Sequence, residues 1–285
     1  MRILKRKVYY YLQHSFRKEG KTITREKYLG KEIPKNIEEI KKSLLEECKK
    51  AGIYAVLGKI KKAFFAEWRR YPVSAKEKVK EQIAIAFTYN TNAIEGSTIT
   101  LEETAELLEH KMAPNKPLRD IEETQSHAKV FLEMIEHPEI ISIPIILKWH
   151  KAVFERTKSD IAGRFRDYLV RVGDHVAPDW QDVKRLMNEL IKFYSLNKAR
   201  MHPVELAARI HYRFEKIHPF GDGNGRVGRL IMNSLLWQQN WPMLIIEFKK
   251  RKFYYRALQK GEDAFFNYFV RYYLRAHRGL LKRTK

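Results

Sequence analysis

The sequence has very little cysteine and no long apolar run. Cys48 is the single cysteine among 285 residues, so no disulfide can form within the chain and a reducing compartment, the cytoplasm, is expected. The longest apolar stretches, such as 243–246, are far too short to span a bilayer, so we expect no membrane partner. The basic residues at the start are followed by no apolar segment, and this excludes a signal peptide.

Acidic residues are also scarce relative to basic ones. The chain has 56 Lys+Arg against 34 Asp+Glu, a formal net charge of +22. Such a surface attracts phosphates, nucleic acid or an acidic partner. Because the lysines are spread along the chain rather than grouped, the charge favours solvated faces over a nucleic-acid site. No Cys/His cluster has zinc-ligand spacing, and the 44% hydrophobic content is that of a folded globular chain.

Hydrophobic periodicity predicts a mainly α fold with short strands. Residues 1–34 are expected to form a β-hairpin, with strands at 8–16 and 22–28 around Gly20. Residues 35–79 form a helical extension with a break near Gly52, and 80–285 form the main helical domain. Ser74 is the expected N-cap of the helix that ends at Gly96. Further helices are expected at 101–110, 119–136, 143–155, 180–194, 203–217, 224–239, 250–260 and 263–281.

One segment of the main domain reads differently from its helical surroundings. Residues 163–178 contain an alternating core at 169–172, followed by Gly173 and Asp174, which can make a tight turn. This pattern predicts a small β-hairpin.

A tight glycine-rich loop carries the chemistry. It lies between two amphipathic helices in the segment from Ile217 to Arg229, which reads IHPFGDGNGRVGR. Its glycines allow close approach of the backbone to a ligand, and the next helix begins with free N–H groups that favour an anion. We expect Asn224 at the helix cap, with Arg226 and Arg229 on nearly the same helix face. These features predict a polyphosphate cradle.

Two further side chains of the loop complete this chemistry. Asp222 offers a carboxylate oxygen suited to a Mg²⁺ ion that phosphates also bridge. His218 stands just before the loop, and imidazole is the usual general base near neutral pH. A plain turn with surface arginines would not need all these residues in this order.

The loop resembles the signature of the Fic family, His-Pro-Phe-x-Asp/Glu-Gly-Asn-Gly-Arg-x-x-Arg, at every fixed position. The resemblance covers roughly residues 80 to 275 and implies a helical Fic fold with a β-hairpin flap. It implies a protein adenylyltransferase that uses ATP and Mg²⁺ to place AMP on a Ser, Thr or Tyr hydroxyl of a target protein. It also implies that His218 is the base and Phe220 anchors the loop in the core.

The resemblance assigns the remaining loop residues to the nucleotide. Asp222 binds Mg²⁺, while Gly223, Asn224 and Gly225 cradle the phosphates. Arg226 and Arg229 hold the β- and γ-phosphates. Glycine at 225 favours AMP transfer, since relatives that act as kinases carry lysine there.

Two segments outside the loop join the implied site. The flap residues Leu169, Val170, Arg171 and Val172 would pair with an extended target segment by strand addition. Tyr255 would line the adenine pocket. Relatives have an asparagine beyond this tyrosine, and 259–263 offers no counterpart, so its partner is unassigned.

An upstream segment resembles the inhibitory motif of the same family, Ser/Thr-x-x-x-Glu-Gly/Asn. Thr91, Glu95 and Gly96 match its fixed positions, and the first two share a helix face. The resemblance implies that Glu95 pairs with Arg229 and blocks the γ-phosphate site. In some relatives this glutamate also helps water to remove AMP from the target, so de-AMPylation is a secondary hypothesis.

Alternative functions stay open at this stage. A nucleic-acid-binding regulator would use the basic charge, although nucleic acid is not the main partner we expect. The same scaffold can also transfer UMP or another nucleotide. The N-terminal residues to about 70 either recruit the target, form a homodimer contact or cover the core.

Overall fold

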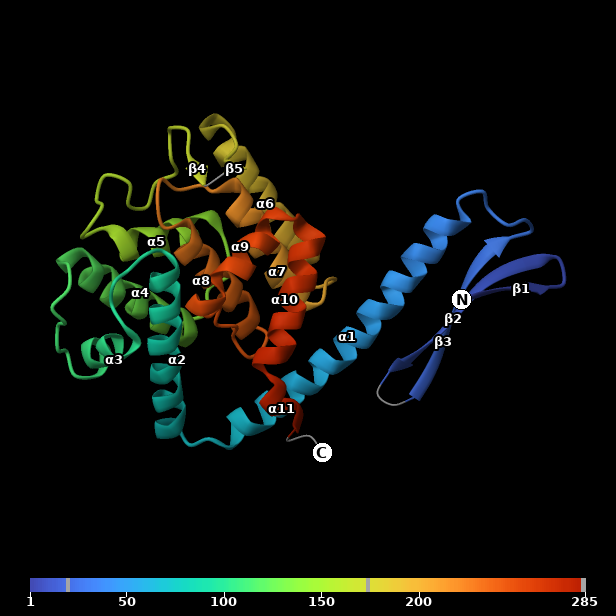
Figure 1. Ribbon diagram of the computed structural model, residues 1–285, viewed down its shortest axis with the longest axis horizontal. Helices are drawn as coiled ribbons and strands as arrows, with labels where there is room; N and C mark the ends of the chain where they lie inside the picture. The colour runs from blue at the N-terminus through green and yellow to red at the C-terminus, as the bar shows by residue number, and fades with distance from the viewer. Residues whose placement is uncertain (19–20, 173–174, 283–285) are drawn as a thin grey trace. The chain divides into compact units, whose positions relative to one another are not determined.

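The structure is a computed structural model that describes residues 1–18, 21–172 and 175–282 (Figure 1). The chain divides into two compact units. The first comprises Met1–Phe64 with Arg278–Lys285, and the second comprises Phe65–His277. The domain boundaries expected from the sequence stay predictions.

The first unit contains a three-stranded antiparallel sheet instead of the expected hairpin. Its strands are β1 (Arg2–Arg6), β2 (Tyr9–Lys18) and β3 (Lys21–Gly30), in the order β1-β2-β3. The expected hairpin corresponds to β2 and β3, and the turn at Gly20 lies outside the described residues. The strand β1 was not predicted because only Ile3 and Leu4 interrupt its charged residues.

A long helix, α1 (Ile37–Arg70), follows the sheet and packs its first half against it. Leu44 and Cys48 of this helix meet Leu12 and Leu29 of the sheet in a buried cluster. The expected break near Gly52 is wrong, because the helix is continuous over 34 residues. A lone glycine costs a helix only about 1 kcal/mol, which a helix of this length absorbs.

The second unit is built mainly of helices, which confirms the expected fold class. They are α2 (Val73–Ile94), α3 (Leu101–Glu109), α4 (Leu118–Glu136), α5 (Ile143–Phe154), α6 (Val183–Asn197), α7 (Pro203–Ile217), α8 (Asn224–Trp237), α9 (Arg251–Gln259) and α10 (Glu262–Ala276). Short 3₁₀ turns precede α6 and α9. The helix α11 (Arg278–Lys282), which follows α10 in the chain, belongs to the first unit. The expected N-cap at Ser74 is wrong, because α2 already begins at Val73 after Pro72, whose fixed φ suits a helix start.

Helix α8 lies at the centre of the second unit (Figure 1). Every residue from Asn224 to Leu236 is buried, and α2, α4, α5 and α7 pack around the helix. A helix buried on all sides is fixed in place by its neighbours. The loop that leads into α8 is therefore held by the core of the unit.

The expected flap hairpin is present but short. Its strands are β4 (Arg171–Val172) and β5 (His175–Val176), paired antiparallel. Leu169 and Val170 precede β4, and the Val170 carbonyl accepts a hydrogen bond from the Ala177 amide. The tight turn expected at 173–174 lies outside the described residues.

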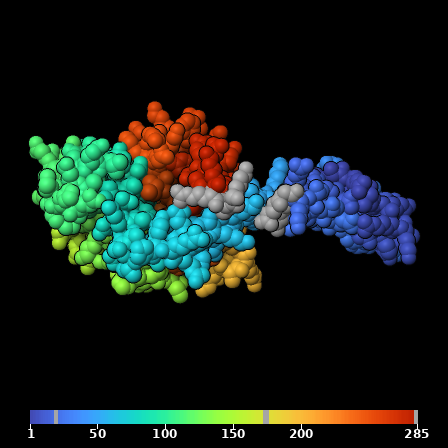
Figure 2. All heavy atoms as spheres, turned by 90° about the horizontal axis from the view of Figure 1, so that it is seen from below, coloured from blue at the N-terminus to red at the C-terminus, as the bar shows by residue number. Residues whose placement is uncertain are grey.

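The helices of the second unit also define its surface. The N-terminal helices (cyan and green) and the C-terminal helices (orange and red) occupy different parts of that surface in Figure 2. Within the described part of the chain, no helix combines the length and apolar character needed to cross a bilayer.

Candidate active site

The Asn224 side chain closes the loop between α7 and α8 through hydrogen bonds to the loop backbone. His218 ends α7 with φ of 51°, and Gly223 caps α8 with φ of 79°, so both residues turn the chain sharply. The Asn224 side chain accepts a hydrogen bond from the Phe220 amide and donates one to the Phe220 carbonyl, each at 2.8 Å. Asn224 is therefore the first helical residue, and the prediction that it caps α8 is wrong because Gly223 holds that place.

His150 on α5 packs against the loop and hydrogen-bonds to its backbone. Its ring stacks on Phe220, with ring centroids 3.8 Å apart. Nδ1 accepts from the Gly163 amide at 2.9 Å, which leaves Nε2 to donate to the Asp222 carbonyl at 3.0 Å. Burial lowers the pKa of His150 to about 4, so the ring is neutral at pH 7. His150 thus holds the loop backbone as an uncharged linker.

His218 is positioned by its backbone and by its own helix. Its Nδ1 lies 3.4 Å from the Glu215 carbonyl oxygen, an acceptor, so a neutral ring carries its proton on Nδ1 and keeps Nε2 as the basic nitrogen. A non-glycine residue with positive φ is strained, and such strain is typical of functional sites. This arrangement suits a general base.

Arg166 ties the flap to the loop. This buried side chain donates to the carbonyls of His218 and Tyr168, each at 2.8 Å, and to that of Pro178 at 2.6 Å. Tyr168 and Pro178 flank the flap, and Tyr168 also lies so close to Gly221 that a Cβ there would meet its hydroxyl at 2.0 Å. The flap and the loop are therefore fixed to one another.

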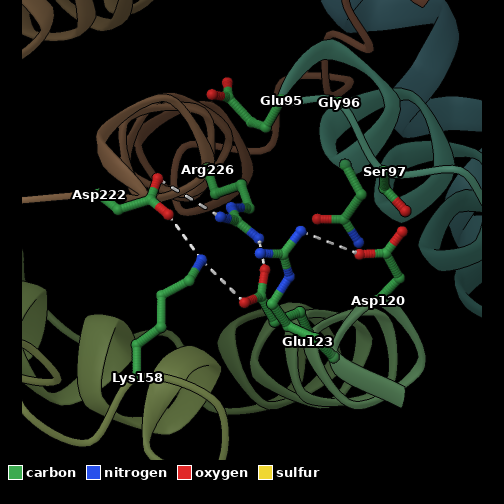
Figure 3. A pocket seen from close by; sticks show the side chains of 10 residues that line it. Glu95, Gly96, Ser97, Asp120, Glu123, Lys158, Asp222 and Arg226 are labelled. Atoms are coloured by element: carbon green, nitrogen blue, oxygen red, sulfur yellow. Dashed lines mark hydrogen bonds and ion pairs between the residues drawn. The ribbon is translucent and has the colours of Figure 1, made fainter. Parts of the chain in front are cut away.

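A network of four charged side chains lies beside the loop. Arg226 bonds to buried Glu123 of α4 and lies 3.7 Å from Asp222. Lys158 bonds to Asp222 Oδ2 at 2.6 Å and to Glu123 Oε1 at 2.9 Å. The four line a pocket of about 120 Å³, shown in Figure 3, together with Glu95 and Arg119 among others.

The two carboxylates of this network stay ionised. Burial alone would raise the pKa of Glu123 and of Asp222, but Arg226 and Lys158 outweigh it and lower both. The guanidinium of Arg226 also lies over the Phe154 ring, 4.3 Å from its centroid. The pocket therefore presents fixed charges of both signs next to the α8 N-terminus, which suits a phosphate with a metal ion.

Glu95 and Arg229 form the expected pair. Arg229 is buried and donates to Glu95 Oε1 at 2.6 Å and to the Thr91 carbonyl at 3.1 Å. Burial alone would lower the pKa of Arg229, but the Glu95 carboxylate raises it, so the guanidinium is charged. Gly96 follows with φ of +94° and ends α2.

Glu95 also lies directly over Gly225. A Cβ at Gly225 would come within 2.2 Å of Glu95 Oε1 and within 2.9 Å of Arg229 Nη1. The side-chain space at this position is thus filled by the carboxylate of Glu95.

The remaining predicted residues lie near this centre or on the surface. The Tyr255 hydroxyl donates to the Ile94 carbonyl at 3.2 Å, and burial followed by the Glu95 charge raises its pKa to about 12. Tyr255 is therefore placed beside the end of α2. In the flap, Leu169 is 66% exposed and the Arg171 side chain is also exposed.

Several residues of the site were not assigned a role from the sequence. They are Glu123, His150, Lys158, Arg166 and Glu215, whose pKa burial raises to about 7. The Lys158–Asp222 bond joins residues 64 apart, and the Arg226–Glu123 bond joins residues 103 apart. Contacts between residues so far apart in the sequence cannot be predicted from the spacing of residues within a local motif.

Comparison with known proteins finds a family match that includes this loop. Residues 140–236 match the profile of the Fic/DOC family. The Protein adenylyltransferase Fic of Nematostella vectensis is 37% identical over 193 residues, which are 66% of this chain and 45% of that protein. Its namesake in Aedes aegypti is 33% identical over 204 residues, 70% of this chain and 41% of that protein. The chain thus spans less than half the length of these curated relatives.

Solved structures share the fold. A Fic domain-containing signalling protein from Bacteroides thetaiotaomicron superposes with a TM-score of 0.68 at 25% identity, over 78% of this chain and 97% of that one. Residues 134–508 of Fic-1 from C. elegans give a TM-score of 0.71 at 23% identity, over 90% and 80% of the respective chains. The second likeness concerns the fold alone.

Proposed function

Because this chain contains a domain of the Fic/DOC family, we propose that it is a protein adenylyltransferase that transfers AMP from ATP to a hydroxyl of another protein. The observation that carries the proposal is the loop from His218 to Arg229, which combines a base, an anion-binding helix start and two arginines. The names of the curated relatives, 37% and 33% identical to this chain, support the same activity.

In the proposed reaction His218 takes the proton of the target hydroxyl. The hydroxyl oxygen then bonds to the α-phosphorus, the bond to the β-phosphate oxygen breaks, and pyrophosphate leaves. The N-terminal amides of α8 and the guanidinium groups of Arg226 and Arg229 stabilise the phosphates. Positioning and charge neutralisation supply the catalysis, as in other phosphoryl transfers.

Asp222 is the proposed ligand of Mg²⁺. Its Oδ2 already accepts the Lys158 ammonium at 2.6 Å, so the carboxylate is oriented to receive a cation. Mg²⁺ characteristically uses one or two carboxylates together with phosphate oxygens and water, which fits Asp222, whose side chain is 44% exposed at the pocket. When bound, the ion would neutralise charge on the phosphates.

Glu95 is the proposed brake of the enzyme. Its carboxylate engages Arg229 and fills the space over Gly225, which a bound triphosphate would need. Glu95 and the γ-phosphate compete for one guanidinium, so the phosphate can bind Arg229 only after Glu95 leaves. Removing the carboxylate should therefore increase AMP transfer.

The flap is the proposed docking strand for the target. Arg171 and Val172 pair with β5 on one edge, and an extended target segment would pair with the opposite edge. The exposed Leu169 is placed to contact its side chains.

Intact mass spectrometry after incubation with Mg-ATP tests the proposal. The proteins are wild type, Glu95→Gly, Glu95→Gly with His218→Ala, and Glu109→Gly as a matched control at the exposed end of α3. We expect only the Glu95→Gly protein to gain AMP. A parallel incubation with a cell lysate and ATP labelled at the α-phosphate detects modification of other proteins. No transfer in either assay would overturn the proposed activity.

The mass added also identifies the donor. The same incubation with UTP in place of ATP would give a UMP adduct if the enzyme prefers a uridine nucleotide. Competition between the two nucleotides then ranks them.

A reducing compartment, the cytoplasm, is also proposed. Cys48 is buried, and burial raises the pKa of its thiol, so the single thiol is protected from reaction. Cell fractionation with an antibody against the chain tests this location.

A further inference from the structure

Lys158 places an ammonium against Asp222, the proposed metal ligand. Its ammonium lies 2.6 Å from Asp222 Oδ2 and 2.9 Å from Glu123 Oε1. In Figure 3 the lysine reaches across the pocket from the opposite side to the loop, and its nitrogen lies between the two carboxylates. Its side chain is only 20% exposed, so this ammonium is a fixed part of the pocket.

The local structure after α5 holds the lysine in this place. The Lys158 amide bonds to the Phe154 carbonyl at 2.8 Å, and the Lys158 carbonyl accepts from the Ala162 amide at 3.0 Å. The ammonium also lies 5.0 Å from the centroid of the Phe154 ring. The backbone is thus anchored on both sides, and only the side chain can move.

The two carboxylates depend on Lys158 to different degrees. Glu123 also receives Arg226 and the Thr157 hydroxyl, the latter at 3.0 Å. Asp222 Oδ2 has no other hydrogen-bond partner among the residues that the structure describes, while Oδ1 accepts from the Gly223 amide. Withdrawal of Lys158 would therefore leave Glu123 paired and free one oxygen of Asp222.

We propose that Lys158 is a built-in counter-cation, which holds the metal position at Asp222 in the resting protein and gives it up to the divalent ion that accompanies the nucleotide. This proposal rests on the proposed function, because it takes Asp222 to be the metal ligand. The ammonium keeps its contact with Glu123 and withdraws only from Asp222.

Electrostatics makes this a competition. An ammonium and a divalent cation at the same carboxylate oxygen repel each other, and this repulsion is strong in a partly buried pocket. Lys158 therefore weakens metal binding in the absence of nucleotide. The phosphates of a bound nucleotide add negative charge and favour the divalent ion, so metal binding becomes coupled to nucleotide binding.

The test measures Mn²⁺ binding by electron paramagnetic resonance, which needs no transfer reaction. The titration is made without nucleotide and again with α,β-methylene-ATP, whose bridging carbon blocks cleavage. The proteins are wild type, Lys158→Met, Lys158→Arg and Lys148→Met. Lys148 lies on α5, pairs with Glu139 at the surface and is 58% exposed, so its variant matches the change in net charge.

We expect Lys158→Met to bind Mn²⁺ about fivefold more tightly without nucleotide, as loss of a competing ion pair implies. Lys158→Arg and Lys148→Met should bind Mn²⁺ as wild type does. Equal or weaker Mn²⁺ binding by Lys158→Met would overturn the proposal, and so would equal tightening in Lys148→Met.

The arms of the experiment separate this inference from the proposed function. If Lys158→Met binds Mn²⁺ more tightly but α,β-methylene-ATP binds none of the proteins, even after Glu95→Gly is added to each, Lys158 competes with a divalent ion at Asp222, whereas the exchange for a nucleotide-borne ion and the adenylyltransferase proposal both fail. If Lys158→Met loses nucleotide affinity with no gain in Mn²⁺ affinity, Lys158 is a phosphate ligand and the counter-cation is refuted. A thermal melt of each variant confirms that it is folded.

Discussion

Because Gly225 has no Cβ, the Glu95 carboxylate can lie directly over it. A Cβ at position 225 would lie 2.2 Å from Glu95 Oε1. A methyl group there would push Glu95 from Arg229 and leave a buried guanidinium without its carboxylate. The pair and the glycine are therefore energetically linked.

The double-mutant cycle of Gly225→Ala with Glu95→Gly measures this link. We expect Gly225→Ala to lower the free energy of unfolding by about 1 to 3 kcal/mol in wild type, as overpacking does. In the Glu95→Gly background the same change should have less than half that effect, because Arg229 can then move away. Urea denaturation gives the four values. Additive effects would show that the two positions do not interact.

Arg166 is the residue that joins the flap to the loop. Arg166→Ala removes three strong hydrogen bonds to backbone carbonyls, and we expect the free energy of unfolding to fall by about 3 kcal/mol. AMP transfer by a Glu95→Gly protein should fall with it, since His218 and the flap lose their common support.

The neighbouring exposed arginine provides the control for this change. Arg164→Ala should alter stability by no more than about 0.5 kcal/mol and leave transfer unchanged. Similar losses in both variants would contradict the positioning role of Arg166.

At the scale of elements, the end of α2 is held from α9. The Tyr255 hydroxyl donates to the Ile94 carbonyl, one residue before Glu95. Tyr255→Phe removes this hydrogen bond and keeps the ring. If Glu95 is the brake as proposed, we expect self-modification to rise about fivefold, because a hydrogen bond of about 1 kcal/mol no longer holds the end of α2 in the position that pairs Glu95 with Arg229.

The rate of AMP incorporation under saturating Mg-ATP checks this expectation. The increase should be smaller than that of Glu95→Gly, which removes the proposed brake itself. An unchanged or slower rate would mean that the hydroxyl does not restrain α2. Nucleotide affinity measured alongside separates this effect from loss of an adenine contact.

Elements with strong local signals were predictable from the sequence, and those set by distant contacts were not. The helix predicted at 203–217 has those bounds, the one predicted at 224–239 begins at Asn224 and ends at Trp237, and Gly96 ends its helix with positive φ. By contrast, β1 forms only because β2 is available to pair with it. The local sequence around Gly52 predicts a helix break, but α1 continues through this residue.

The same distinction applies within the site. The loop motif predicts a helix start after its glycines, and the resemblance of residues 91–96 to the family's inhibitory motif implies the pairing of Glu95 with Arg229. It cannot predict that Glu123 receives Arg226 or that Lys158 meets Asp222, since these partners come from α4 and from the turn after α5. The tertiary packing around α8 brings them together.

At the scale of the whole molecule, buried histidines set the dependence of stability on pH. Burial lowers the pKa of His150 and of His277 to about 4, that of His211 to about 3, and that of His127 well below its usual value. As pH falls from about 6.5 to about 4, the unfolded chain takes up protons that these rings refuse in the folded state. Stability therefore falls over this window.

One buried acid acts in the opposite direction. The folded pKa of Glu215, about 7, lies above its unfolded value, so its protonation stabilises the fold as pH drops from about 7 towards 4.5. Four histidines outweigh one glutamate. We expect the free energy of unfolding to be roughly 3 to 5 kcal/mol lower at pH 5 than at pH 7.

Urea denaturation followed by tryptophan fluorescence measures this difference. Equal stability at the two pH values would contradict it. The slope of the transition with urea should be the same at both, which shows that the same unfolding is observed.

The division of the chain into two units also separates its natural reporters. All five tryptophans lie between residues 68 and 241, in the second unit, whereas the single thiol, Cys48, is buried in the first. Fluorescence therefore follows one unit, and the reaction of the thiol with a coloured reagent follows the other. The order in which the two units open can thus be timed in a single sample of the native sequence.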